Sequence, residues 1–206
     1  MKKTLTAFAT TVLLGAMPLA WAASSTDLTV TGTITPTACT PLLSNGGVVD
    51  YGKIAAKDLN ETTNTIIGRD TLQLTVNCVA PVQFALAPVD NNPGTASNGD
   101  WWGLGLTNAA ERLGFIVTTM SNTLADGQPA QTIISTNNGS TWHAHHHMRP
   151  GRLLSVASSA DPTTPLAAQD TGIDLLVTTH IAPTNGLTLI DDVVINGSVT
   201  FEMKYL

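Results

Sequence analysis

Two segments near the ends of the chain alternate strictly between apolar and polar positions. In residues 28–34, apolar residues and glycine occupy the even positions and threonines the odd ones. In residues 193–205 the odd positions are apolar or glycine, and Thr200, Glu202 and Lys204 lie between them. Because side chains of a β-strand point alternately to opposite faces, each segment is predicted to be a strand with one apolar and one solvated face.

Short apolar or alternating segments recur between these two ends, and clusters of glycine, asparagine and proline separate them. We predict strands over residues 48–52, 71–78, 82–86, 113–119, 131–135, 153–157 and 173–181. Residues 71–78 and 82–86 are expected to be neighbours, residues 107–113 to be briefly helical, and residues 121–130 and 158–169 to be loops. Many short strands with frequent turns predict an all-β fold, either a sandwich or a barrel.

The dipeptide Asn196-Gly197 allows two interpretations of the C-terminal segment. It can be a tight hairpin turn that pairs residues 188–195 with residues 198–205. It can also be a bulge inside one long strand, which the unbroken alternation across Gly197 favours.

The first 22 residues have the pattern of a signal peptide. Lys2 and Lys3 precede an uncharged run over residues 4–20, and Ala20-Trp21-Ala22 matches a cleavage site with small residues at both ends. A membrane anchor is the alternative, but 17 uncharged residues are short for a span and Pro18 interrupts them. We therefore expect a signal peptide over residues 1–22 and one exported domain over residues 23–206, with an N-terminal arm over residues 23–35.

The charge of the chain argues against some partners. The formal net charge is −6, and it becomes −8 when Lys2 and Lys3 leave with the signal peptide. An acidic chain with few Lys and Arg residues is a poor candidate for binding nucleic acid or an anionic membrane. The predicted location is the periplasm or the cell surface, with no membrane span after the signal peptide is removed.

The two cysteines, Cys39 and Cys78, both lie after the signal peptide. An even number of cysteines in an exported chain favours one disulfide. Cys78 shares its parity with Leu72, Leu74 and Val76, so its side chain is predicted to point into the core. A metal pair or a redox pair fits less well, because the spacing is long and no Cys-x-x-Cys motif is present.

The N-terminal arm with Gly32 seven residues before Cys39, the second cysteine at the end of a strand, and the C-terminal Thr200-Phe201-Glu202-Met203-Lys204-Tyr205-Leu206 resemble the pilin subunits of chaperone–usher fimbriae. In that family an immunoglobulin-like β-sandwich lacks its last strand. A periplasmic chaperone fills the resulting groove, and the arm of the next subunit then replaces it. The resemblance implies that the donor-strand residues are Leu28, Val30, Gly32 and Ile34. It also implies that the acceptor groove and chaperone contact comprise Val199, Phe201, Met203 and Tyr205.

The resemblance also implies the partners of this chain, which are a periplasmic chaperone, an outer-membrane usher and other fimbrial subunits. The chain is also similar to an uncharacterised family of exported proteins that are often encoded beside chaperone–usher genes, through residues 28–40, 45–52 and 103–114. It departs from the pilin pattern at Val193, where pilins usually carry glycine. The pair Trp101-Trp102 and a histidine-rich segment resemble insertions.

The segment Trp142-His143-Ala144-His145-His146-His147 is the most unusual local pattern. On a strand, His143, His145 and His147 share one face and are candidate ligands for zinc, copper or nickel. The alternative is a polar surface loop with weak metal affinity, because no closed ligand set can be named from the sequence.

No motif predicts an enzyme or a cofactor. Asp170-Thr171-Gly172 matches the short aspartic-protease motif, but that mechanism needs two carboxylates and no second copy exists. The leading hypothesis is therefore a fimbria-like structural or adhesion-associated subunit. The alternative is a soluble periplasmic β-sandwich that binds a ligand or a metal.

Overall fold

The computed structural model describes residues 28–32 and 38–206. The chain forms two units, Met1–Ile34 and Thr35–Leu206. In the first unit, residues 28–32 are not part of a strand, and the side chains of Leu28 and Val30 are 90% and 86% exposed. The predicted strand over residues 28–34 is therefore not formed in this part, and Ile34 lies outside the described residues.

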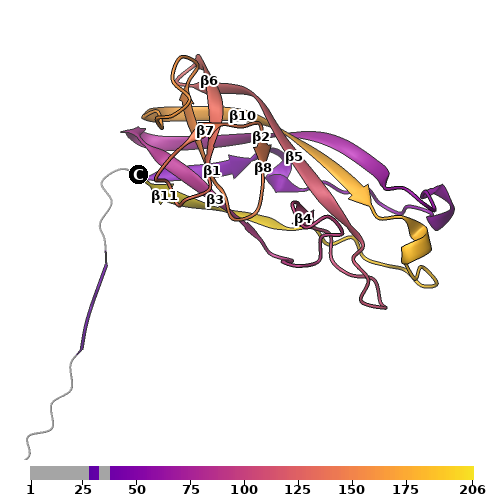
Figure 1. The fold of residues 1–206 in the computed structure, drawn as a ribbon. Coiled ribbons are helices and arrows are strands. Elements are labelled where there is room, and N and C mark those ends of the chain that lie inside the picture. The colour runs from indigo at the N-terminus through magenta and orange to yellow at the C-terminus, as the bar shows by residue number, and fades with distance from the viewer. Residues whose placement is uncertain (1–27, 33–37) are drawn as a thin grey trace, which may run out of the picture. The chain divides into compact units, whose positions relative to one another are not determined.

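The second unit is an all-β domain with one disulfide, as predicted (Figure 1). Its eleven strands are β1 (Cys39–Leu43), β2 (Thr65–Val82), β3 (Phe84–Asp90), β4 (Trp102–Gly103), β5 (Gly114–Ala125), β6 (Gln128–Ser135), β7 (His143–Ala144), β8 (His147–Met148), β9 (Leu153–Ser158), β10 (Ala168–Ile181) and β11 (Val199–Tyr205). Three short 3-10 segments accompany them: η1 (Ser44–Gly47), η2 (Ala56–Asp58) and η3 (Thr184–Gly186). Within the described residues no helix is long and apolar enough to cross a membrane.

The strands form two antiparallel layers of a sandwich. The first sheet has the order β1-β2-β10-β5, and the second has the order β6-β9-β3-β11. Strands β5 and β6 pair beside the turn that connects them, so the eight strands follow one continuous path. The two ends of that path are β1 and β11, and the sandwich is therefore nearly closed with these two edges left over.

The strands β2 and β3 belong to different sheets, although the sequence predicted them as neighbours. The chain passes from the first sheet to the second at Gln83, which lies between the two strands. Pro81 has no N–H to donate to a ladder, which favours the end of strand pairing at this point. The alternation of apolar residues continues through the crossing, and for that reason the pattern alone did not reveal the change of sheet.

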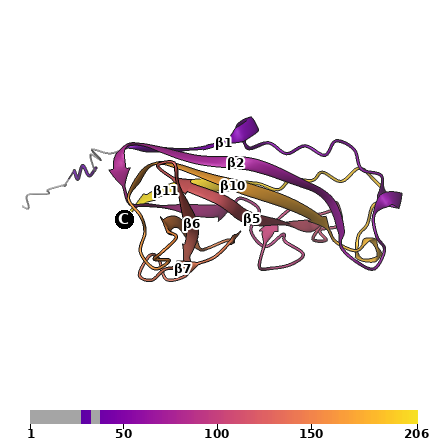
Figure 2. The same cartoon turned by 90° about the horizontal axis from the view of Figure 1, so that it is seen from above.

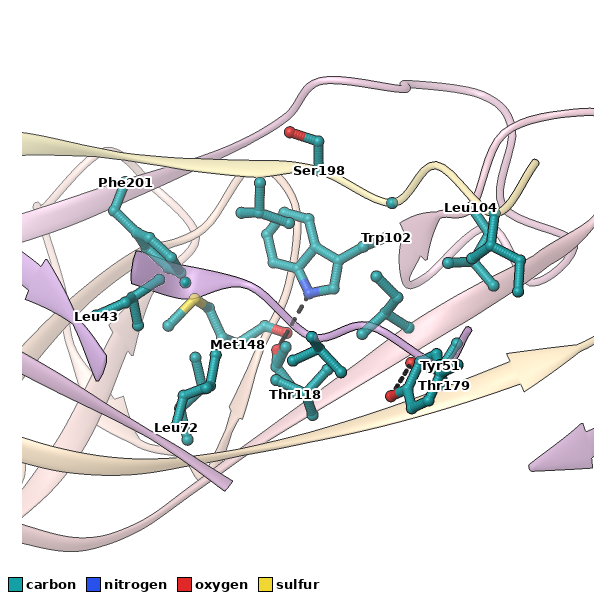
Figure 3. Close-up of a pocket in the computed structure, with 18 residues that line it drawn as sticks. Leu43, Tyr51, Leu72, Trp102, Leu104, Thr118, Met148, Thr179, Ser198 and Phe201 are labelled. Carbon is teal, nitrogen blue, oxygen red and sulfur yellow. Dashed lines mark hydrogen bonds between the residues drawn. The ribbon is translucent and has the colours of Figure 1, made fainter. Parts of the chain in front are cut away.

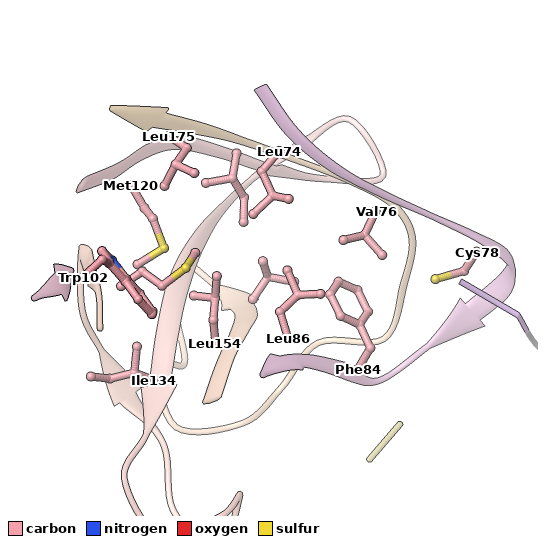
Figure 4. Packing of buried hydrophobic residues seen from close by; sticks show 13 residues of the cluster. Leu74, Val76, Cys78, Phe84, Leu86, Trp102, Met120, Ile134, Leu154 and Leu175 are labelled. Atoms are coloured by element: carbon pink, nitrogen blue, oxygen red, sulfur yellow. The ribbon is translucent and has the colours of Figure 1, made fainter. Parts of the chain in front are cut away.

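The core lies between the two sheets, where the inward faces of the strands meet (Figure 4). The predicted parity of β2 is confirmed, since Leu72, Leu74, Val76 and Cys78 are at most 7% exposed. From the second sheet, Phe84, Leu86 and Leu154 fill the same core. Val199, Phe201 and Met203 of β11 pack against it and remain half-buried.

The predicted disulfide joins Cys39 of β1 to Cys78 of β2. The two residues are direct partners in the antiparallel register, which continues to Leu43 opposite Leu74. The bond therefore holds the edge strand β1 at the start of the folded unit against a central strand.

The segment over residues 121–130, predicted to be a loop, is a β-hairpin. Strand β5 continues to Ala125, and β6 begins at Gln128. The two residues between them, Asp126 and Gly127, have φ angles of 49° and 74°. Positive φ at both positions is the geometry of a tight hairpin turn, and Asp-Gly is a dipeptide that favours it.

Both interpretations of Asn196-Gly197 are wrong, because residues 188–198 form no strand that could pair as a hairpin or continue β11 through a bulge. Strand β11 pairs with β3 along its whole length, from Val199 opposite Asp90 to Tyr205 opposite Phe84. A Cβ atom at Gly197 would lie 2.5 Å from the Ile116 side chain and 2.9 Å from that of Leu104. The glycine therefore permits a close passage of the chain over the first sheet, and no strand is formed before Val199 in this segment.

The two sheets differ in length. Strands β2, β10 and β5 have 18, 14 and 12 residues, whereas β3, β9 and β11 have 7, 6 and 7. Figure 2 shows β2, β10 and β5 running side by side along the domain. The part of the first sheet beyond the second is covered by connecting segments, whose apolar side chains form a smaller core. Its members are Leu59, Ile67, Leu104, Leu113, Ile116, Ile181, Leu187, Val193 and Ile195.

Candidate strand-binding groove

The two free edges of the sandwich, β1 and β11, face each other. At one end the backbone N–H of Cys39 donates a hydrogen bond to the Tyr205 hydroxyl oxygen at 2.9 Å. Tyr205 is 38% exposed, so its ring lies at the sheet edge while its hydroxyl contacts β1 rather than water alone. This contact connects the two edges at the end of the domain where the disulfide lies.

A hollow of about 240 Å³ opens between the edges beyond this contact (Figure 3). Leu43 lies on one side of it, and Val199 and Phe201 of β11 lie on the other. Among the residues that the structure describes, no charged side chain lines this hollow. It gives access to the side of the main core that a further strand would cover in a closed sandwich.

A second hollow of about 890 Å³ continues in the same direction. The two share Val49, Tyr51 and Ile195 as lining residues, so they adjoin. At the far end Lys53 Nζ lies 3.8 Å from a carboxylate oxygen of Asp192. We call the combined feature the edge groove. One wall is formed by residues 43–56 and the other by residues 189–201, and the walls are antiparallel because Cys39 lies near Tyr205 and Lys53 near Asp192.

The walls of the far half have no regular hydrogen-bonding partners. Within residues 38–206, neither residues 49–54 nor residues 189–195 make a backbone–backbone hydrogen bond, and neither segment is a strand. Backbone amides and carbonyls at a free edge can pair with an added extended segment. The backbone N–H of Gly52 bonds to the Asp50 carboxylate at 2.8 Å. The edge groove nevertheless has the two features that a strand-binding site needs, which are an apolar floor and described backbone groups along its sides that pair with no other backbone group.

Tyr51 fixes the first wall to the sheet. Its hydroxyl lies 2.9 Å from the Thr179 hydroxyl oxygen on β10, and its ring covers Gly68 on β2, where an added Cβ would lie 2.1 Å from the ring. Burial raises the pKa of Tyr51, and Asp70 nearby raises it further. The hydroxyl therefore stays protonated in the neutral range and remains available for this hydrogen bond.

Glu111 fixes the start of the second wall. Its carboxylate accepts hydrogen bonds from the backbone N–H and the hydroxyl of Thr188, at 2.6 and 2.9 Å, and from the Thr107 hydroxyl at 2.7 Å. These bonds, with the backbone N–H of Thr188 first, lower the pKa of Glu111. The segment around it was predicted to be helical, but it is a turn in which the Thr107 N–H bonds to the Glu111 carbonyl and Ala110 has a φ of 64°.

Hydrogen bonds hold the residues of the groove floor in place. Trp102 is fully buried, and its indole N–H donates to the Thr118 hydroxyl oxygen at 3.1 Å. That hydroxyl donates in turn to the Met148 carbonyl at 2.9 Å. Figure 3 shows Trp102, Met148 and Thr118 together beneath the opening. A buried indole with its N–H satisfied gives a large apolar contact surface without an unpaired donor.

The predicted acceptor residues lie at different places along this groove. Val199 and Phe201 line it, Met203 packs against the main core, and Tyr205 contacts β1 at the closed end. Of the predicted donor residues, Leu28 and Val30 are exposed, and a Cβ at Gly32 would meet no atom within 4 Å. Whether these residues act as donor and acceptor stays a prediction.

The histidine-rich segment spans the opposite side of the sandwich and does not form one strand. His143 lies in β7, which pairs with β6, whereas His147 lies in β8, which pairs with β5. The ring centroids of His143 and His145 are 6.2 Å apart, and those of His145 and His147 are 5.9 Å apart. In the described part of the chain no three His, Cys, Asp or Glu side chains are arranged to hold one metal ion. Metal binding by these histidines stays a prediction.

Sequence reasoning missed several residues that shape the groove. Tyr51 was assigned only to a candidate strand, and Glu111 only to a short helix. The pair Trp101-Trp102 was interpreted only as part of an insertion, yet Trp102 is buried at the centre of the floor. The close pairing of Tyr51 with Gly68 had no sequence signal, because it depends on two segments that the fold brings together.

Comparison with known proteins gives a family but no activity. Residues 28–132, which are about half of the chain, match the family model described as "Protein of unknown function (DUF1120)". Protein GltF of Escherichia coli K12 is 41% identical over 76 residues, which are 35% of this chain and 30% of GltF. The uncharacterized protein YhcF of the same strain is 32% identical over 80 residues, which are 39% of this chain and 34% of YhcF. The chain thus spans about a third of the length of these relatives.

Proposed function

We propose that this chain, which belongs to the family of unknown function DUF1120, is a fimbria-like structural or adhesion-associated subunit. In this proposal a periplasmic chaperone and then another subunit place an extended segment in the edge groove. The arm of this chain, with Leu28, Val30, Gly32 and Ile34 as its apolar face, is donated to a neighbour. An outer-membrane usher is the expected assembly partner.

The observation that carries the proposal is the apolar groove between two free sheet edges. An added strand gains main-chain hydrogen bonds from the edges, and its alternate side chains enter the groove. Burial of three aliphatic side chains contributes up to roughly 5–9 kcal/mol. The disulfide supports the proposal further, since such bonds are typical of proteins outside the cytoplasm.

The test is deletion of residues 24–34 in the exported protein, with a chaperone co-expressed. The arm lies outside the folded unit Thr35–Leu206, so the deletion variant is expected to fold, to bind the chaperone and to fail to join other subunits. An insoluble deletion variant would instead support the rival function, a closed periplasmic sandwich that binds a small ligand or a metal and needs the arm as its own strand.

A further inference from the structure

The two halves of the edge groove differ in charge. The hollow beside β1 and β11 has no charged residue in its lining within the described part of the chain. The far hollow is lined by Asp50, Lys53, Asp191 and Asp192, and each of these residues is exposed at the mouth. Lys53 is the one cation among these lining residues and it pairs with Asp192, so among the described residues the carboxylates of Asp50 and Asp191 form no salt bridge. An occupant of the groove thus meets an uncharged stretch at one end and an acidic mouth at the other.

We propose that the partner segment which fills this groove is an extended strand with alternating apolar residues and a Lys or Arg at the end that lies in the acidic mouth. This inference rests on the proposed function, because it concerns the occupant of the same groove. Complementary charges speed the encounter of two proteins and fix the direction of binding, whereas like charges reject the wrong partner.

The arm of this chain does not carry that charge. Between Ala23 and Ala38 its sole charged side chain is Asp27, directly before the alternating residues. If the arm binds with Asp27 at the acidic mouth, that carboxylate lies near Asp50 and Asp191, which is unfavourable, and in the opposite direction the arm brings no positively charged side chain to the mouth. The groove therefore selects a strand from a different protein over the arm of a second copy, and we expect mixed assembly rather than a polymer of this chain alone.

The experiment compares labelled peptides binding to the full exported protein by fluorescence anisotropy. The first peptide has the sequence of residues 24–35, with Asp27 near its start. The second carries Asp27→Lys. The third carries Asp27→Asn and Thr35→Lys, so that the charge lies at the other end. One of the two lysine peptides is expected to bind about three- to tenfold more tightly than the first, which is the effect of one or two exposed ion pairs. Which of the two lysine peptides binds more tightly identifies the direction of binding.

The preference is expected to shrink at about 1 M salt, where charges are screened within roughly 3 Å. It should also disappear in the Asp191→Asn/Asp192→Asn variant. The matched control is Asp126→Asn/Asp161→Asn, which makes the same change in net charge at two turns that do not line the groove. Equal affinity of all three peptides overturns the charge inference and leaves the proposed function standing. Binding of none of them contradicts both.

Discussion

Tyr51 and Gly68 show how two residues set the shape of the groove. The ring lies so close to the glycine that an added methyl group would fall 2.1 Å from it. The Thr179 hydroxyl then holds the phenol in that place. A single position on β2 thus decides where the wall over residues 49–54 can lie.

We expect Gly68→Ala to reduce the free energy of unfolding by about 1–3 kcal/mol, the usual cost of overpacking, because the ring must move. It should also weaken peptide binding in the groove. Gly172→Ala is the matched control, since that glycine lies in β10 and a Cβ there meets no atom within 4 Å. Its effect is expected to stay within about 0.5 kcal/mol. Equal losses in the two variants, measured by urea unfolding, would contradict this account.

At the scale of elements, the histidine-rich segment closes the side of the sandwich opposite the groove. The backbone N–H of Met120 on β5 bonds to the His146 carbonyl at 2.7 Å, and the Thr132 hydroxyl on β6 bonds to the His145 carbonyl at 2.6 Å. The segment therefore joins the two sheets where β5 and β6 diverge. Its half-buried imidazoles make this join sensitive to protonation.

Burial lowers the pKa of His145 and of His147, and the nearby His146 and Arg149 lower both further. The unfolded chain then binds protons more readily than the folded one as the pH falls below the ordinary histidine value of 6.5. The contribution of these neutral imidazoles to stability is therefore complete above that pH and is lost as the pH decreases through it and toward the lowered pKa values of the folded state.

We expect the urea midpoint to fall between pH 7.5 and pH 5, and to fall less in the His145→Gln/His147→Gln variant. His180 on β10 contributes in the same direction, because burial lowers its pKa and Arg69 adds to the effect. His180→Gln is therefore measured separately. If the double variant keeps the full pH dependence of the parent protein, the half-buried imidazoles of this segment are not its source.

The disulfide also acts at the scale of elements, because it holds the edge strand β1 against β2. Its two cysteines are 39 residues apart in sequence. Loss of a disulfide from a small exported domain typically costs about 2–5 kcal/mol. We expect Cys78→Ser to reduce the free energy of unfolding by this amount, and reduction of the parent protein to have a similar effect. Two free thiols in thiol labelling of denatured, unreduced periplasmic protein would show that the bond does not form.

At the scale of the whole molecule, the arm and the groove can be tested separately. A Cβ at position 32 meets no atom of the described residues within 4 Å, so Gly32→Val should leave the subunit folded, within about 0.5 kcal/mol of the parent protein. If the arm is donated, the same change should block its entry into a narrow part of a neighbour's groove. Thr31→Val, on the solvated face, should do little.

The measurement is the size distribution of co-expressed subunits, together with urea unfolding of each isolated variant. Folded Gly32→Val protein that no longer joins other subunits is the expected result. A Gly32→Val monomer that unfolds on its own would place the arm inside its own sandwich. Normal assembly of that variant would remove Gly32 from the donor face.

The sequence determined the local features of this protein, because strand patterns depend on neighbouring residues. The alternation of β2 placed Leu74, Val76 and Cys78 in the core, and the alternation of β11 placed Val199 and Phe201 on its inner face. An even cysteine count in a chain that the sequence predicts to be exported was enough to predict the disulfide. The all-β class followed in the same way from many short alternating segments.

Only the tertiary structure decided how these strands are joined and what lies between them. The change of sheet at Gln83 and the close passage at Gly197 depend on contacts between residues far apart in the sequence, which alternation does not encode. The groove has the same origin, because its walls come from two segments about 140 residues apart that lie opposite each other after β1 and before β11. Periodicity reports which face of a strand is buried, but only the packed fold shows which buried face lacks a covering strand.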